Sequence, residues 1–311
     1  MHLMIPFAAP GSEAGRLALA QLCKLNLLPH LAALLAGAAP PECDEADAHS
    51  LSPPHERALA RAVGLAGADG QLPWAAWWAA QEGRDLGDLV WGQLTPAHWH
   101  VGTDQITMLD PDQLQLTEAD SRALLDAVQD LFTSEGYVLV YGVPTRWYLA
   151  HESLAGLATA SPDRVIGRPL DPWLPRGPQA RTWRRLQNEV QMRLHGHALN
   201  EAREARGLPP VNSLWLSGCG PAQAVRERPD LTQDTRLRAP ALAEDWGAWQ
   251  AAWQAIDAGP LAALRGQTAR SRLTLCGEMA SATWTLAPPS PWQRLMMRVR
   301  RFDLLPLLET L

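Results

Sequence analysis

Short apolar runs alternate along this chain with stretches whose apolar positions recur every three or four residues. HLMIPFA (2–8) is an apolar run closed by Pro and Gly, which is typical of a strand. Residues 13–36 have helical spacing, and Pro29 predicts a break that divides them into two helices. GYVLVYG and TRWYLAHE predict two strands that form a hairpin around Val143-Pro144.

The middle of the chain continues this alternation. ITMLDPDQLQLTEADSRALLDAVQDLF predicts a strand, a turn and a helix whose Thr-Glu-Ala-Asp start suits capping. Residues 178–206 predict one long helix, ended by Gly207 and a pair of prolines. VNSLWLSGCG (211–220) then predicts a buried strand. Its Gly218 and Gly220 indicate a close approach of the backbone to a ligand or to another packed element.

The last third predicts a further helix and two strands. DWGAWQAAWQAID (245–257) places three tryptophans on one helical face, and SRLTLCGE and SATWTLA read as strands. SPWQRLMMRVRRF predicts an amphipathic, basic closing helix, and the Pro-rich acidic connection 37–56 predicts a mobile loop. The predicted class is α/β, with a mixed or mostly parallel central sheet flanked by helices.

Composition narrows the classes of partner. The 311 residues are 47% hydrophobic and 19% charged, which is typical of a soluble globular protein. A net charge of −6 predicts no nucleic-acid partner, because binding phosphates requires a concentrated basic surface. No apolar run approaches the roughly 20 residues that span a bilayer, so we expect no membrane partner.

The four cysteines are scattered, without a CxxC pair. The opening MHLMIPFAAPG is too short and wrongly flanked for a signal peptide, so we expect free thiols and a cytoplasmic location. Cys219, between two glycines, could be an activated thiol. No histidine stands near it in the sequence, which favours a structural cysteine.

His98, His100 and Asp104 form the nearest approach to a metal cluster. On a strand, residues at i and i+2 share a face, as ligation of one metal would need. The other interpretation is a pair of loop histidines beside a buried Trp99, and it is the favoured one. Four side chains of the 37–56 connection could also collect a cation, although solvated surface is favoured: Asp44, Asp47, His49 and His55.

Arginine supplies almost all of the positive charge, and Lys24 is the only lysine. Five arginines fall at strand ends, loops and a helix end within 137–220, where their heads could converge on an anion or remain solvated. They are Arg146, Arg164, Arg168, Arg203 and Arg206.

Three segments in this order resemble the substrate-binding half of archaeal-type cofactor-independent phosphoglycerate mutases: GYVLVYGVPTRWYL, LATASPDRVIGRPLDPWLP and HALNEAREARGLPPVNSLWLSGCG. Asn200 to Arg203 match the family's Asn-x-x-Arg helix end. Asn212 to Gly220 match its Asn-x-x-Trp-Leu-Trp-Gly-x-Gly strand. The resemblance covers about residues 136–220. As a whole, the chain most resembles proteobacterial proteins termed RpfE-type regulatory proteins.

The resemblance implies an alkaline-phosphatase-superfamily fold, whose chemistry uses two divalent metals held by Asp and His and a Ser or Thr nucleophile. The departures remove those ligands. The family's first strand ends in Asp-Gly, but here it ends in PFA (6–8). The family's late Asp-Glu-x-Gly-His motif is replaced by LTLCGEMASATW, with Glu278 alone, and its Pro-Pro-His-Asp loop by SPDR (161–164). Without those ligands a two-metal centre cannot neutralise a transferring phosphoryl group.

The resemblance further implies two domains. Residues 1–100 and 221–311 would form a degenerate phosphatase-like core, and residues 101–220 a smaller inserted α/β subdomain on the substrate side. We predict a non-catalytic or weakly catalytic regulatory protein that needs no cofactor and binds a small phosphorylated or acidic metabolite in an arginine-lined cleft. The predicted ligand-binding residues are Arg146, Asp163, Arg164, Asn200, Arg203, Asn212, Gly218 and Gly220.

Two alternatives stay open. One is a phosphoglycerate mutase-like or phosphatase enzyme whose Zn or Mn is held by rearranged ligands, with His98, His100 and Asp104 as the weak candidates. The other is a protein-interaction module built on tryptophan-rich surfaces, for example around Trp74, Trp77 and Trp78.

Overall fold

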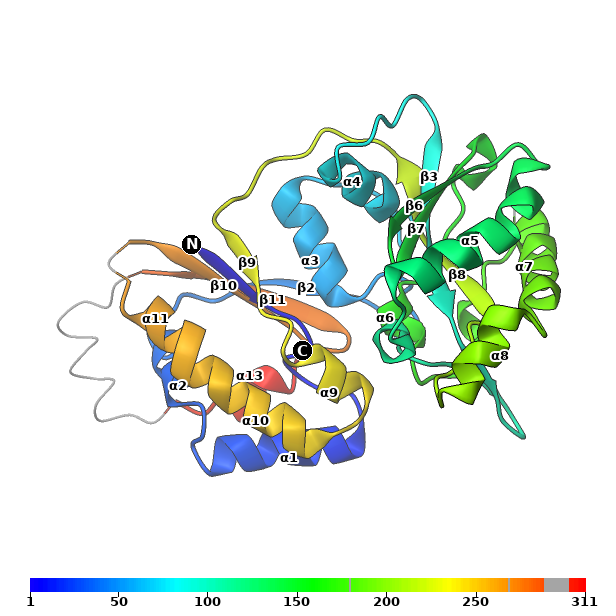
Figure 1. Cartoon of the computed structure of the whole chain (residues 1–311). Coiled ribbons are helices and arrows are strands. Elements are labelled where there is room, and N and C mark those ends of the chain that lie inside the picture. The colour runs from blue at the N-terminus through cyan, green and yellow to red at the C-terminus, as the bar shows by residue number, and fades with distance from the viewer. Residues whose placement is uncertain (179, 268, 288–301) are drawn as a thin grey trace. The chain divides into compact units, whose positions relative to one another are not determined.

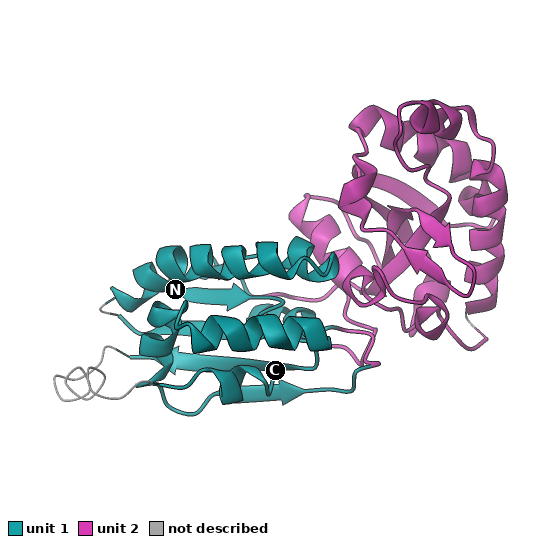
Figure 2. Ribbon diagram, turned by 90° about the horizontal axis from the view of Figure 1, so that it is seen from below, with its two compact units in different colours: residues 1–48, 53–63, 226–311 teal, residues 49–52, 64–225 magenta. Residues whose placement is uncertain are grey.

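The computed structural model describes residues 1–178, 180–267, 269–287 and 302–311 (Figure 1). The chain forms two compact units, each with its own sheet and hydrophobic core (Figure 2). Unit 1 comprises Met1–Ala48, Pro53–Val63 and Arg226–Leu311, and unit 2 comprises His49–Ser52 and Gly64–Val225.

Unit 1 contains a mixed five-stranded sheet in the order β2-β11-β10-β1-β9. The first strand, β1, runs parallel to both of its neighbours, β10 and β9, whereas β11 runs antiparallel to β10 and β2. The strands are β1 (His2–Ile5), β2 (Glu42–Glu45), β9 (Leu231–Gln233), β10 (Ser271–Cys276) and β11 (Ala280–Leu286).

Both faces of this sheet are covered by helices. Leu3 and Ile5 of β1 join the larger core with the helices on one face, and Met4 packs with Ala58 of α3 on the other. This alternation is the period of two that a strand imposes. The helices of unit 1 are α1 (Glu13–Lys24), α2 (Pro29–Leu35), α3 (Pro54–Val63), α9 (Arg238–Leu242), α10 (Trp246–Ile256), α11 (Ala262–Arg265) and α13 (Leu305–Leu308), with a π-helical turn, η4 (Asp257–Leu261), after α10.

Unit 2 contains an antiparallel four-stranded sheet in the order β6-β7-β3-β8, and a separate two-stranded ribbon, β4-β5. The strands are β3 (Val90–Ala97), β4 (Trp99–Val101), β5 (Ile106–Met108), β6 (Val138–Val143), β7 (Arg146–Ala150) and β8 (Ser213–Pro221). Their side chains alternate between two helical layers. Trp147 and Leu149 face the core that includes α5 and α7, while Tyr148 and Ala150 face α4.

Capping residues mark helix ends in unit 2. Thr117 caps α5, because its hydroxyl accepts the Asp120 amide at 3.1 Å, as the sequence predicts. The unit contains α4 (Trp74–Gln81), α5 (Glu118–Thr133), α6 (Pro162–Val165), α7 (Ala180–Leu194) and α8 (Ala198–Ala205), with three short 3₁₀ turns, η1 (Pro111–Leu114), η2 (Glu152–Leu154) and η3 (Asp171–Trp173).

The predicted α/β class with a mixed, helix-flanked sheet is confirmed, and so are the hairpin and the break near Pro29. The single helix predicted over 178–206 is two helices, because Gly196 takes a left-handed φ of 66° between them. The 37–56 connection contains the edge strand β2. The predicted closing helix, SPWQRLMMRVRRF, lies almost wholly outside the described residues.

The sequence interpretation places its domain boundaries at 100 and 220, whereas the main segment of unit 2 runs from Gly64 to Val225. Residues 64–100 lie in unit 2, because they contain β3, which pairs with β7 and β8 in the middle of that sheet. In the described part of the chain, no single helix is long and apolar enough to cross a membrane. Of the described helices, only α1 and α2 taken together have the required length and apolar composition, and the chain bends by 83° between them.

Candidate functional site

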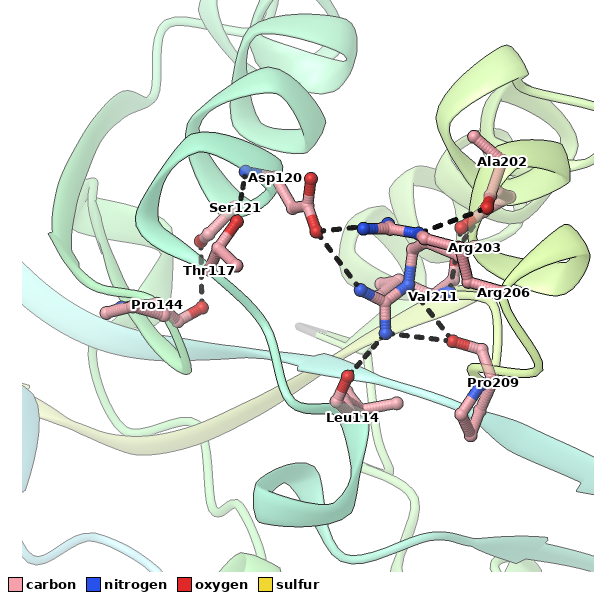
Figure 3. A network of polar contacts seen from close by, with 11 residues as sticks. Leu114, Thr117, Asp120, Ser121, Pro144, Ala202, Arg203, Arg206, Pro209 and Val211 are labelled. Atoms are coloured by element: carbon pink, nitrogen blue, oxygen red, sulfur yellow. Dashed lines mark hydrogen bonds and ion pairs between the residues drawn. The ribbon is translucent and has the colours of Figure 1, made fainter.

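Arg203, the predicted anion-binding arginine of α8, is fully buried and bonded to its own protein (Figure 3). Its Nε and Nη2 donate to the carbonyl of Pro209 at 3.1 and 3.0 Å, and Nη2 also donates to the carbonyl of Leu114. Its Nη1 lies 3.4 Å from Oδ2 of Asp120. Burial lowers the pKa of Arg203, and the charge of Asp120 opposes that effect. An anion could reach this guanidinium only by displacing these partners.

The two predicted asparagines have similar internal roles. Asn200 is buried, donates to the carbonyl of Val211 at 2.8 Å and accepts the Val211 amide at 2.9 Å. Asn212 accepts the Trp99 amide at 2.7 Å and donates to the Trp99 carbonyl at 2.9 Å. Each side-chain amide therefore replaces a backbone partner at the start of β8. These contacts make Asn200 and Asn212 parts of the scaffold.

The predicted close approach at Gly218 and Gly220 is a packing contact with the start of α4. A Cβ on Gly218 would lie 2.9 Å from Cβ of Trp74, and one on Gly220 would lie 2.7 Å from Cβ of Pro73. Gly218 also has φ of 62°, and two residues of β8 face one residue of β3 there, which defines a β-bulge. The neighbouring element in this case is a helix.

Cys219 lies in the same bulge and is buried. Burial raises the pKa of its thiol to about 12, although a hydrogen bond with Thr159 acts in the opposite direction. The thiol is therefore protonated at neutral pH, as expected of a structural cysteine.

Arg146 lies in a different and partly exposed cluster at the hairpin of β6 and β7. Its Nη2 donates to Oε1 of Glu82 at 2.6 Å, and its Nε donates to the hydroxyl of Tyr148 at 2.9 Å. That hydroxyl in turn donates to the same Glu82 oxygen at 2.8 Å. The guanidinium carbon of Arg146 lies 4.7 Å from the ring centroid of Trp78.

A second arginine, Arg84, reaches the same carboxylate. Its Nε lies 3.6 Å from Oε2 of Glu82, and its Nη2 donates to the carbonyl of Tyr141. The side chains of Arg84, Glu82 and Arg146 are 33%, 23% and 22% exposed, so solvent reaches all three. We name Glu82, Arg84, Arg146, Trp78 and Tyr148 the arginine-pair cluster. The sequence interpretation missed Glu82 and Arg84, whose only signal is a charged pair directly after a tryptophan-rich helix.

Electrostatics hold the cluster in one protonation state. Partial burial raises the pKa of Glu82, but hydrogen bonds from Arg146 and Tyr148 outweigh it and bring the pKa below its ordinary value. Burial and the adjacent Glu82 raise the pKa of Tyr148. At neutral pH the cluster thus holds one carboxylate and two guanidinium groups, with one positive charge in excess.

Arg164 has a third set of partners. It is buried on α6, and its Nη2 donates to the hydroxyl of Ser50 at 3.1 Å. Asp163 precedes it in the first turn, where the Asp163 amide donates to the Ser161 hydroxyl at 3.3 Å. Glu82, Ser50 and Pro209 thus accept hydrogen bonds from Arg146, Arg164 and Arg203 respectively, so each arginine has a different partner.

The weak metal candidates are also separated by their contacts. Nδ1 of His98 is 2.8 Å from the carbonyl of Pro210, whereas His100 is exposed on the ribbon and Asp104 is exposed in its turn. Within residues 1–178, 180–267, 269–287 and 302–311 no three His, Cys, Asp or Glu side chains gather as metal ligands. The described residues therefore do not fit the two-metal centre that the resemblance implies.

The structure also shows the contacts of two other groups of residues that the sequence indicates, Asp44 and the tryptophans of α4. Asp44 forms an ion pair with Arg57 of α3 at 2.7 Å, which ties the edge strand β2 to that helix. Trp74 is buried, whereas Trp77 and Trp78 are partly exposed. The ring centroids of Trp74 and Trp77 are 5.6 Å apart and those of Trp77 and Trp78 are 4.5 Å apart, both in edge-to-face orientation. An interaction surface at these tryptophans stays a prediction.

The end of β1 holds a strained residue. Phe7 has φ of 57°, a left-handed conformation that is uncommon for a bulky side chain. Its carbonyl accepts from Nε1 of Trp249 at 3.0 Å, and its ring lies 5.2 Å from that of His55. The surrounding contacts therefore hold Phe7 in a conformation that suits glycine better.

No protein-family model matches this chain. It is 27% identical over 118 residues to a probable 2,3-bisphosphoglycerate-independent phosphoglycerate mutase of Geobacter sulfurreducens, a match that covers 38% of this chain and 30% of that protein. It is 34% identical over 64 residues to the 2,3-bisphosphoglycerate-independent phosphoglycerate mutase of Methanothrix thermoacetophila, covering 21% of this chain and 16% of that protein. The matches thus span less than a third of either relative's length.

Among solved structures, the cofactor-independent phosphoglycerate mutase of Thermoplasma acidophilum has 16% identity and a TM-score of 0.39, covering 92% of this chain and 89% of that one. The PH0037 protein of Pyrococcus horikoshii has 14% identity and a TM-score of 0.38, covering 92% and 87%. The two sequence matches carry the relationship: this mixed α/β protein is a distant homologue, over part of its length, of cofactor-independent phosphoglycerate mutases.

Proposed function

We propose that this protein is a non-catalytic relative of those mutases that binds a small phosphorylated or carboxylated metabolite at the arginine-pair cluster of unit 2. One observation carries the proposal. Two partly exposed guanidinium groups, from Arg84 and Arg146, converge on the single carboxylate of Glu82. That carboxylate occupies the place that an acidic ligand would take.

The chemistry of the cluster suits an exchangeable anion. Arginine presents a planar fork that pairs with carboxylate or phosphate through parallel hydrogen bonds. Stacking on Trp78 holds the Arg146 head in place, which reduces the entropy lost on binding. The ligand competes with Glu82, and its second negative charge, where it has one, meets the excess positive charge of the cluster.

Three features support binding without phosphoryl transfer. The family's first strand ends in Asp-Gly, whereas the first strand here is followed by Pro6-Phe7-Ala8, which contains no carboxylate. The described residues offer no three-ligand metal group. The matched motif residues Asn200, Arg203 and Asn212 serve the scaffold. The inherited motif then preserves architecture, and a binding protein of this kind acts as a metabolite sensor. Membership of the RpfE-type regulatory group stays a prediction.

Phosphorus NMR tests both halves of the proposal in one sample. Binding is followed with 3-phosphoglycerate and then with other phosphorylated metabolites without added metal, because paramagnetic Mn²⁺ itself broadens phosphorus resonances. For turnover, the sample is then incubated with Mn²⁺ or Zn²⁺ and treated with EDTA before the spectrum is recorded. We expect broadening or a shift of the resonance of at least one compound, with no new phosphorus signal over hours. Appearance of 2-phosphoglycerate or inorganic phosphate would establish the enzyme alternative instead.

A further inference from the structure

His2, at the amino end of β1 in unit 1, is a buried residue with a hydrogen-bond partner at one of its two ring nitrogens. Its Nε2 lies 2.8 Å from Oγ1 of Thr274, and that oxygen lies 2.8 Å from Oγ1 of Thr283. The side chain is only 3% exposed. The three residues form a polar row across β1, β10 and β11, on the face opposite the larger core.

Two buried nitrogen atoms beside this row have no hydrogen-bond partner in the described part of the chain: Nδ1 of His2 and Nε of Arg272. The residues are direct partners in the β1–β10 register, so their side chains leave the same face of the sheet. When Thr283 donates to Thr274 and Thr274 donates to Nε2 of His2, the ring proton lies on Nδ1. In this hydrogen-bond arrangement, two N–H donors on paired residues of neighbouring strands are buried without an acceptor.

Buried polar groups in native proteins are almost always paired, so two neighbouring orphan donors indicate an acceptor that completes them. The local charge shows what kind. The Arg272 side chain is 40% exposed, and its Nη2 lies 3.2 Å from a carboxylate oxygen of Glu42, whose side chain is 79% exposed. Arg228, also near His2, is paired with Asp230 at 2.8 Å. The positive charge of Arg272 is therefore only weakly compensated.

We propose that Nδ1–H of His2 and Nε–H of Arg272 are the donors of a second ligand site, which takes a small oxyanion with a phosphate or carboxylate group. A single oxyanion accepts hydrogen bonds from both atoms through one or two oxygens and offsets the charge of Arg272. The site lies in unit 1, at the amino ends of β1 and β10, and is separate from the arginine-pair cluster.

The site can be followed directly at the histidine ring. Burial first, and then the charges of Arg272 and Arg228, lower the pKa of His2 to about 4, whereas Asp230 raises it and the amino group of Met1 lowers it. A bound oxyanion stabilises the imidazolium form, so its binding raises this pKa, by about one to three units for an opposite charge in contact.

The experiment is proton–nitrogen correlation NMR on the histidine rings of the full chain, with inorganic phosphate or acetate titrated against chloride at constant ionic strength. We expect a saturable shift of the His2 Nδ1 resonance with at least one of the two anions, and a raised His2 pKa when that anion is bound. A response to phosphate alone identifies a phosphate group, and a response to acetate identifies a carboxylate. No saturable shift with either would overturn the proposal and leave a water molecule as the acceptor.

Variants separate this site from surface charge. Arg272→Gln should weaken the anion response at least about tenfold, since a charge-assisted hydrogen bond is lost. Arg270→Gln, an exposed arginine two residues away, is the matched control and should retain it. An equal response in both variants would contradict the assignment. Should Arg272→Gln fail to fold, the pKa of His2 in the unaltered protein with and without anion decides the matter. Arg146→Gln should leave the His2 response unchanged.

Discussion

Gly218 of β8 packs directly against Trp74, the first residue of α4, so closely that a methyl group on Gly218 would lie 2.9 Å from Cβ of that tryptophan. The same glycine has φ of 62°. Gly218→Ala combines a steric clash with an unfavourable backbone angle, and we expect it to lower the free energy of unfolding by about 2–4 kcal/mol. Urea unfolding followed by tryptophan fluorescence measures the change.

Two other glycines separate the causes. Gly220→Ala meets Cβ of Pro73 at 2.7 Å without a left-handed φ, so it reports the contact alone. Gly83→Ala has φ of 74° but no atom within 4 Å, so it reports backbone strain alone, about 1 kcal/mol. A Gly218→Ala protein as stable as the parent would show that α4 does not pack against β8 in this way.

Arg203 should matter for stability and not for ligand binding. Arg203→Met leaves the carbonyls of Leu114 and Pro209 without their donor, and we expect a loss of about 2–4 kcal/mol in the free energy of unfolding. Arg206→Met is the matched control, because Arg206 is 52% exposed and contacts the same Asp120 at 3.5 Å. Its loss should be about 0.5 kcal/mol or less. Similar losses in the two variants would refute the internal role of Arg203.

The pH dependence of stability should carry the signature of His2. Its pKa is lowered from 6.5 to about 4 in the folded protein, so between these pH values the unfolded chain binds a proton that the folded chain does not. Stability therefore falls as pH falls through this window, by about 1.4 kcal/mol for each unit of pKa difference at most. Urea midpoints measured in chloride buffers should show this slope.

The slope should be reduced in His2→Gln and retained in His100→Gln, whose parent histidine is exposed. If the free energy of unfolding of His2→Gln depends on pH with the same slope as that of the parent protein, the effect belongs to other groups.

The cysteines should differ sharply in reactivity toward an aromatic disulfide reagent at about pH 8, because the thiolate is the reacting species. Cys43 is exposed and should react at once. Burial raises the pKa of Cys219 to about 12, so it should react only as fast as the protein unfolds. A Cys23→Ser/Cys43→Ser variant keeps only the two buried thiols, those of Cys219 and Cys276, and so isolates the slow phase. Fast labelling of Cys219 in that variant would revive the activated-thiol interpretation.

Local patterns in the sequence predict local elements well. The apolar run at 2–8 and the Thr117 cap both predict what the structure contains, because strand period and capping depend on residues only a few positions apart. β3 escaped prediction because Gly92 and Pro96 interrupt it, although it lies inside the sheet of unit 2.

The candidate site could be predicted far less well, because its partners are distant in the chain. The sequence identifies Asn212 as a motif residue, but its partner Trp99 is 113 positions away, so local patterns do not show its scaffold role. The sequence likewise indicates Arg146 but not its carboxylate partner Glu82, which is 64 positions away. A single sequence shows which side chains can bind an anion. Only the fold shows which of them are already occupied.

Isothermal titration calorimetry with a set of phosphorylated and carboxylated metabolites, on the parent protein and three variants, tests the central claim most directly. The claim predicts that Arg146→Gln weakens binding by about tenfold or more, and that Glu82→Gln strengthens it by removing the internal competitor. Arg122→Gln should have no effect, since Arg122 likewise stacks on a ring, that of Tyr141 at 3.9 Å, and pairs with Glu118. Binding that is equal in all four proteins, or absent for every compound, would contradict the account.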